Sequence, residues 1–145
     1  MPPLSKILLA TGAVLVALQL VRCERDNPPV TGEIQAPAEV KAILERACYD
    51  CHSNETVWPW YSQIAPVSWL LHHDVEEGRE HLNFSEWSAL PPDKRAHKLE
   101  EIEELAVEKS DMPLPYYLPL HSNARVSDAD KQVLKAWIDA QKTAP

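Results

Sequence analysis

The pattern Cys48-Tyr49-Asp50-Cys51-His52 constrains this 145-residue chain more than any other feature of its sequence. Two thiols three positions apart, followed at once by an imidazole, suit three different chemistries. A redox dithiol of the thioredoxin type lies beside a βαβ pattern, and no segment here alternates apolar and polar residues for long enough to predict strands. A structural zinc site needs four ligands, so the cysteines would need a second pair such as His72 and His73. Adjacent histidines point in different directions on a helix, which disfavours zinc.

The third chemistry is covalent attachment of haem to the two cysteines. The thiols of Cys48 and Cys51 would add across the vinyl groups, and His52 would lie beneath the iron as the proximal ligand. A five-residue pattern can also arise by chance, so its context matters. Haem of this kind is attached on the outer side of the bacterial membrane, and an export signal in the same chain would therefore favour this interpretation.

The N-terminus supplies such a signal. Residues Ile7–Val21 carry no charge and would form a helix of about 22 Å, short of the roughly 30 Å apolar layer of a bilayer. We interpret residues 1–23 as a signal peptide or a membrane anchor. No small-residue cleavage pattern follows, and Arg22 precedes Cys23 where a lipoprotein site would have a small residue. The sequence therefore predicts an uncleaved anchor in the inner membrane with the domain in the periplasm; a cleaved chain would be secreted and soluble.

The rest of the chain divides into a tether and one helical domain. Residues 24–36 are polar and rich in proline and are interpreted as a tether, and residues 37–145 as a c-type haem-binding domain. A capping-box variant at Ser127-Asp128-Ala129-Asp130 predicts the start of the last helix. Apolar residues recur at helical spacing in four segments, which predicts an all-α fold: 37–47, 66–78 with a fading end at Gly78, 93–108 and 127–138.

The charge balance limits the possible partners. A formal net charge of −8 argues against nucleic-acid binding, which needs cations to neutralise phosphates. An acidic surface favours a partner with a basic face, here an unidentified redox protein. The run Glu100–Glu104 is interpreted as the solvated face of a helix.

A second axial ligand would come from far along the chain. Met112 follows His52 by 60 residues and precedes Pro113 in a proline-stiffened loop, a poor position for core packing, so we expect it to be the distal ligand. His121 shares that loop and is the competing candidate. The aromatic residues shortly after the CxxCH pattern would form an apolar sleeve for the macrocycle, and their polar atoms could bond its propionates: Trp58, Trp60 and Tyr61.

Several blocks of the sequence carry a family resemblance: Ala47–Trp69, Asp74–Arg79, Asn83–Trp87, Met112–Tyr117 and the capped C-terminal helix with Trp137. Together they resemble the bacterial haem-binding domain family, small proteins related to class I c-type cytochromes. The resemblance implies a cytochrome c-like domain of about four short helices wrapped around one haem, preceded by an N-terminal apolar helix. It also implies one covalent haem c on Cys48 and Cys51 with His52 as one axial ligand, and it makes Met112 the natural candidate for the other. The first and last domain helices would cross.

These features predict a membrane-tethered monohaem cytochrome that carries single electrons. A methionine on the distal side stabilises reduced iron and fills the sixth position, which discourages oxygen or peroxide chemistry. The expected role is therefore that of a carrier rather than a catalyst. The alternative is a haem-based sensor or peroxide-handling protein in which the distal ligand is displaceable.

Overall fold

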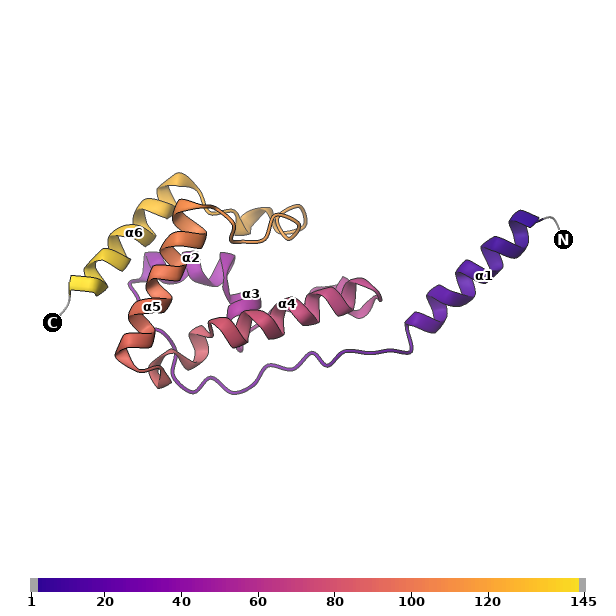
Figure 1. The fold of residues 1–145 in the computed structure, drawn as a ribbon, viewed down its shortest axis with the longest axis horizontal. Coiled ribbons are helices and arrows are strands. Elements are labelled where there is room, and N and C mark those ends of the chain that lie inside the picture. The colour runs from indigo at the N-terminus through magenta and orange to yellow at the C-terminus, as the bar shows by residue number, and fades with distance from the viewer. Residues whose placement is uncertain (1–2, 144–145) are drawn as a thin grey trace.

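The computed structural model describes residues 3–143, which form helices and connecting loops without a β-strand (Figure 1). The all-α prediction is confirmed. The main helices are α1 (Pro3–Leu18), α2 (Ala38–Ala47), α3 (Tyr49–His52), α4 (Val67–His81), α5 (Pro92–Ile102) and α6 (Asp128–Thr143). Short helical turns connect them: η1 (Trp60–Gln63), η2 (Phe84–Ala89), η3 (Glu103–Glu108) and η4 (Ser122–Ala124).

Local sequence signals set where three of these helices begin. Pro37 and Pro66 directly precede α2 and α4, because proline is compatible with the first turn of a helix but not with its interior. The predicted capping box opens α6. The backbone N–H of Ser127 donates to Asp130 Oδ2 at 2.7 Å, and the N–H of Asp130 donates to Ser127 Oγ at 3.2 Å.

Two details of the helices differ from the prediction. Helix α4 does not fade at Gly78 but continues to His81, because Gly78 is packed against the turn that carries Cys51. The run Glu100–Glu104 is not solvated throughout, because Glu103 is only 9% exposed. Glu103 opens the π-helical turn η3, which contacts α6. Glu103 there accepts hydrogen bonds from Lys135 and Lys142.

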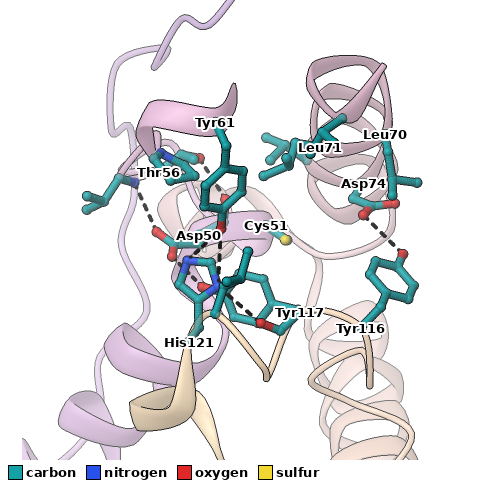
Figure 2. Close-up of a pocket in the computed structure, with 15 residues that line it drawn as sticks. Asp50, Cys51, Thr56, Tyr61, Leu70, Leu71, Asp74, Tyr116, Tyr117 and His121 are labelled. Carbon is teal, nitrogen blue, oxygen red and sulfur yellow. Dashed lines mark hydrogen bonds between the residues drawn. The ribbon is translucent and has the colours of Figure 1, made fainter. Parts of the chain in front are cut away.

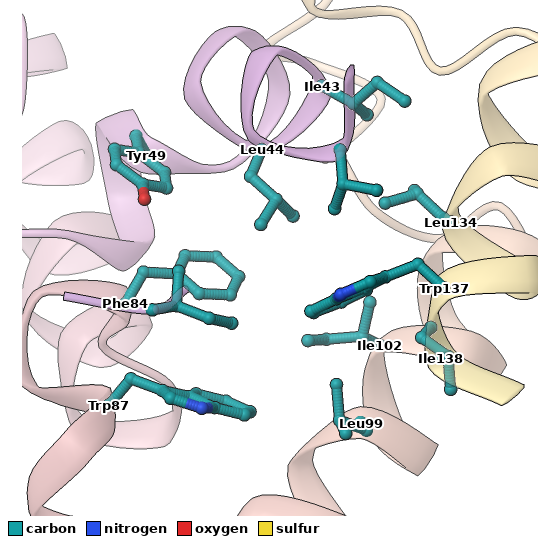
Figure 3. Close-up of a cluster of buried hydrophobic side chains, with 12 residues drawn as sticks. Ile43, Leu44, Tyr49, Phe84, Trp87, Leu99, Ile102, Leu134, Trp137 and Ile138 are labelled. Atoms are coloured by element: carbon teal, nitrogen blue, oxygen red, sulfur yellow. The ribbon is translucent and has the colours of Figure 1, made fainter. Parts of the chain in front are cut away.

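The apolar core lies where α2, α5, α6 and η2 meet (Figure 3). Leu44 of α2 and Leu134 of α6 are almost fully buried, and each contributes roughly 1.5–3 kcal/mol by burial. Helix α2 contacts α6, as the resemblance implied for the first and last domain helices. Phe84 of η2 stacks between the rings of Tyr49 and Trp87 and so links this core to the CxxCH turn.

Helix α1 and residues 24–36 differ in how they contact the rest of the domain. Helix α1 points away from the rest, beyond the N-terminal end of α4 (Figure 1), and has no buried residue. No helix within residues 3–143 has both the length and the apolar character needed to cross a membrane. Residues 24–36 run along the domain. Ile34 is buried in the core, and its N–H donates to the carbonyl of Phe84 at 2.9 Å.

An ion pair joins α2 to the start of α6 and predicts a pH dependence. Arg46 contacts Asp130 Oδ2 at 2.6 Å and donates to the carbonyls of Asn123 and Arg125. The hydrogen bond from Arg46 lowers the pKa of Asp130 from 3.8 to about 2. A carboxyl group whose pKa is lower in the folded state stabilises the fold at pH values above its ordinary pKa. This stabilisation is lost as the pH falls through about 2.

We therefore expect Asp130→Asn to lower the thermal unfolding midpoint much more at pH 7 than near pH 2, where about half of the folded molecules carry a protonated Asp130. Thermal unfolding followed by circular dichroism at both pH values measures the difference. Asp139→Asn is the matched control, since its carboxylate is more exposed and lies 3.6 Å from Lys135. An equal destabilisation by Asp130→Asn at both pH values would contradict the ion-pair explanation.

Candidate functional site

The CxxCH segment forms a tight turn directly after α2. Cys48 ends α2, and its carbonyl accepts hydrogen bonds from the N–H of Cys51 at 3.2 Å and of His52 at 2.9 Å. The buried ring of Tyr49 stacks on Phe84 with centroids 5.5 Å apart. The core therefore holds one residue of the turn and fixes where the cysteines and the histidine lie.

The backbone of α4 orients the imidazole of His52. Its Nδ1 lies 2.8 Å from the carbonyl oxygen of Gly78 and 3.1 Å from that of Leu82. Carbonyl oxygens only accept, so Nδ1 carries the proton and the Nε2 lone pair is available. Burial lowers the pKa of His52, and the two backbone hydrogen bonds oppose this shift. A neutral imidazole held through Nδ1 by a carbonyl is the usual state of a histidine that binds a metal through Nε2.

Gly78 allows α4 to approach the CxxCH turn. A Cβ on Gly78 would lie 2.5 Å from the carbonyl oxygen and 3.0 Å from the carbonyl carbon of Cys51. Those atoms are backbone and cannot rotate away as a flexible side chain could. Any residue other than glycine would therefore push α4 away from the turn and from His52.

The thiols of the turn are free and partly buried. Cys48 packs against the apolar core, and Cys51 lines a pocket beside α4. Burial raises the pKa of each to about 12. Neither forms a disulfide in this structure, so both are available for a covalent bond to another group.

The pocket beside Cys51 lies between α4, η1 and the loop before η4 (Figure 2). It holds about 110 Å³, less than the roughly 300–1,000 Å³ of most cofactor sites. A macrocycle would therefore need exposed side chains at the rim, such as Val57 and Leu120, to turn aside. Its apolar lining is Val57, Pro59, Val67, Leu70, Leu71, Val75 and Leu120; its polar lining is Asp50, Cys51, Thr56, Tyr61, Asp74, Tyr116, Tyr117 and His121.

Two tyrosine–carboxylate bonds fasten the loop of residues 112–121 to the other wall of the pocket. Tyr117 donates to Asp50, inside the CxxCH turn, at 2.5 Å, and Tyr116 donates to Asp74 of α4 at 3.0 Å (Figure 2). Burial and the neighbouring carboxylate raise the pKa of Tyr117 well above its ordinary value, and that of Tyr116 to about 12. Both phenols therefore stay protonated and donate at neutral pH.

His121 lies inside the pocket with two tyrosines. Its ring stacks on Tyr117 with centroids 3.8 Å apart and an angle of 8° between the planes. Its Nε2 lies 3.1 Å from the hydroxyl of Tyr61, and its Nδ1 lies 3.2 Å from the carbonyl oxygen of Tyr117. Both ring nitrogens are thus engaged by the protein.

The other predicted site residues lie around the pocket but do not line it. Met112 is half-buried, and its backbone N–H donates to the carbonyl of Leu105 at 3.2 Å. The indole N–H of Trp58 is buried without a hydrogen-bond partner among residues 3–143. Trp60 is 73% exposed. The structure thus brings Cys51, Tyr61 and His121 together in the pocket. It leaves Cys48 and His52, which belong to the adjoining CxxCH turn, and Met112, Trp58 and Trp60 outside the lining.

The histidine pair considered for zinc belongs to the surface of α4. His72 and His73 lie 3.2 and 3.7 Å from the carboxylates of Glu76 and Glu77, one helical turn away. Within residues 3–143 no three His, Cys, Asp or Glu side chains are grouped as metal ligands would be.

Sequence reasoning missed three residues that shape the site. Gly78 approaches Cys51 and its carbonyl orients His52, while Asp50 and Asp74 hold the loop of residues 112–121. A glycine inside a helical pattern does signal a close approach of backbone, so Gly78 could have been found. Nothing local marks the two aspartates, because their partners lie 67 and 42 residues away.

The chemical groups present suit a haem. Two free thiols, a neutral imidazole with an available Nε2 and an apolar lining are what covalent attachment and axial ligation require. The unpartnered indole N–H of Trp58, six residues after His52, is a donor that a propionate could satisfy.

Comparison with known proteins gives the same assignment. The family model described as "Haem-binding domain" matches residues 13–140. Over 103 residues, 69% of this chain, the sequence is 29% identical to the cytochrome c peroxidase Ccp of Escherichia coli (strain K12). The match spans 22% of that protein's length. No solved structure matches. The family match covers most of the chain, including the CxxCH turn, α4 and the loop of residues 112–121, and the chain therefore belongs to the haem-binding domain family.

Proposed function

We propose that this protein is a membrane-tethered monohaem c-type cytochrome that carries single electrons. One haem c would be bound through thioether bonds to Cys48 and Cys51, with His52 as the proximal ligand. The observation that carries the proposal is the orientation of His52, whose Nδ1 is held by the carbonyls of Gly78 and Leu82 so that Nε2 is left for iron. The haem would supply reversible one-electron oxidation and reduction.

The protein's own residues would set the conditions for that chemistry. The two carbonyls make His52 a better donor to iron and keep its ring in one orientation. With haem bound, the apolar side chains of the pocket beside Cys51 would keep water away from the iron, and a less polar surrounding favours its less charged, reduced state. The bonds from Tyr117 to Asp50 and from Tyr116 to Asp74 hold the loop of residues 112–121 against the CxxCH turn and α4.

We assign Met112 as the distal ligand. Its side chain has no polar partner among residues 3–143, whereas His121 would have to give up a bond to Tyr61 or to the carbonyl of Tyr117. Met112 does not line the pocket in this structure, so ligation requires a shift of the loop that carries it. A thioether ligand keeps the sixth position filled and raises the reduction potential, as a carrier needs.

The remaining parts of the proposal concern the surroundings of the domain. The apolar α1 would hold the chain at the inner membrane, with the domain in the periplasm, where covalent attachment of haem takes place. The net charge of −8 would favour a redox partner with a basic face.

Optical and electron paramagnetic resonance spectra of the matured protein test this assignment. Wild type should be low-spin in both oxidation states and show the weak far-red band of a bond between methionine sulfur and ferric iron. Met112→Ala should abolish that band, lower the reduction potential and let carbon monoxide bind the ferrous form quickly. His121→Ala is the matched control and should keep the band. Its persistence in Met112→Ala, or its loss in His121→Ala alone, would refute the assignment.

A second function, peroxide handling or gas sensing, has one observation in its favour. His121 and Tyr61 lie inside the pocket, where they could act on a small ligand, and the named relative is a cytochrome c peroxidase. Rapid binding of carbon monoxide to the ferrous wild-type protein would favour this function over electron transfer.

A further inference from the structure

A short turn between Pro59 and Pro66 exposes large apolar side chains outside the haem pocket. Trp60 is 73% exposed and Ile64 is 45% exposed. Val57, Val67, Leu70 and Leu120 are also exposed, but they line the pocket, so a bound haem would cover them. Trp60 and Ile64 do not line it and would stay uncovered in the holoprotein.

The end of α1 is bonded to this same turn. The side chain of Gln19 donates to the carbonyl of Ala65 at 3.2 Å and accepts from its N–H at 3.0 Å. The indole N–H of Trp69 donates to the carbonyl of Val21 at 3.0 Å. Two apolar residues at these contacts are exposed to solvent: Leu20 is 83% exposed and Val21 is 60% exposed. The apolar surface of α1 therefore continues onto the domain.

This end of the domain also lacks charge. Residues 57–71 contain no charged side chain, although a quarter of the chain is charged and its net charge is −8. Arg22 and Arg25 lie beside the turn, where they line a small groove with Gln19 and Ser62. An uncharged surface that carries an exposed tryptophan and is flanked by arginines has the character of protein segments at the lipid–water interface.

The length of α1 connects these observations. Its 16 residues extend about 24 Å, so the helix needs residues from its flanks to reach across an apolar layer of roughly 30 Å. A short apolar helix draws its flanks toward the lipid. The C-terminal flank is Gln19–Val21, and it is bonded to the turn that carries Trp60 and Ile64. Drawing in this flank brings the turn to the lipid surface.

We propose that the turn of residues 59–66 is a second membrane contact, which seats the domain on the bilayer with the haem pocket at the interface. This inference rests on the proposed anchoring by α1. The occupant of the exposed apolar surface is lipid rather than a protein partner, because the surface is continuous with α1.

Site-directed spin labelling of the full-length holoprotein in phosphatidylcholine vesicles tests whether residues 59–66 contact the membrane. In a Cys23→Ser background, in which haem occupies the other two cysteines, one nitroxide is placed at Ile64→Cys. The matched control is Ala140→Cys, an exposed position on α6 at the end of the molecule opposite α1 (Figure 1). Power saturation then compares collisions with oxygen, which concentrates in lipid, and with a water-soluble nickel complex.

The ratio of collisions with oxygen to collisions with the nickel complex should be several-fold higher for the label at position 64 than for the label at position 140. Equal ratios at the two positions, in protein that still sediments with the vesicles, would contradict the membrane contact of residues 59–66 but not the anchoring by α1. Protein that does not sediment with the vesicles would contradict both the anchoring by α1 and the membrane contact of residues 59–66. Neither result bears on haem ligation, which the spectra of the same samples report separately.

Discussion

Replacing Cys48 and Cys51 together by serine is expected to leave the protein at the mass of its bare polypeptide after expression with the haem maturation machinery. Each thiol would add its S–H across one vinyl group, forming a carbon–sulfur bond and a new carbon–hydrogen bond. A serine hydroxyl does not undergo this addition under the same conditions. Wild type should gain the mass of one haem, so the change is the complete loss of the covalent cofactor.

The third cysteine provides a matched control for this experiment. Cys23 lies outside the domain core, beside the groove near the end of α1. Cys23→Ser should keep the full mass gain and the wild-type haem spectrum. Intact-mass spectrometry of denatured samples measures all three proteins. A haem-sized mass gain in the double serine variant, or its loss in Cys23→Ser, would show that attachment does not occur at the CxxCH turn.

The parts of the fold that the sequence predicted are those with local causes. Pro37 and Pro66 restrict the backbone at their own positions, so the starts of α2 and α4 follow from single residues. The capping box of Ser127 and Asp130 likewise forms within four residues. The apolar spacing then predicts the helices themselves, because only one face of each can be buried.

The parts that could not be predicted depend on contacts between distant segments. The burial of Glu103 depends on a single π-helical turn and on two lysines of α6. The apolar spacing predicted that the helix would fade at Gly78, yet packing against Cys51 keeps α4 continuous to His81. The CxxCH pattern itself named Cys48, Cys51 and His52, but only the fold shows which backbone atoms orient His52.

Changing Gly78 to alanine is expected to disturb the proximal side of the site. The added Cβ would lie 2.5 Å from the carbonyl oxygen of Cys51, which is backbone, so α4 has to move. Overpacking of this kind costs about 1–3 kcal/mol, and about 4–8 °C per kcal/mol follows for a domain of roughly 100 residues. The thermal unfolding midpoint should therefore fall by about 10 °C.

The same movement should reach the haem through His52, because the carbonyl of Gly78 is the closer of the two acceptors that hold its Nδ1. The ferric resonance spectrum of Gly78→Ala should differ from that of wild type. Gly12→Ala makes the same chemical change where a Cβ meets nothing within 4 Å, so it should alter neither the midpoint nor the spectrum. If Gly78→Ala unfolds at the wild-type temperature with an unchanged spectrum, the close approach of α4 to Cys51 is not what orients the proximal histidine. A lower midpoint with an unchanged spectrum would instead confine the role of Gly78 to packing.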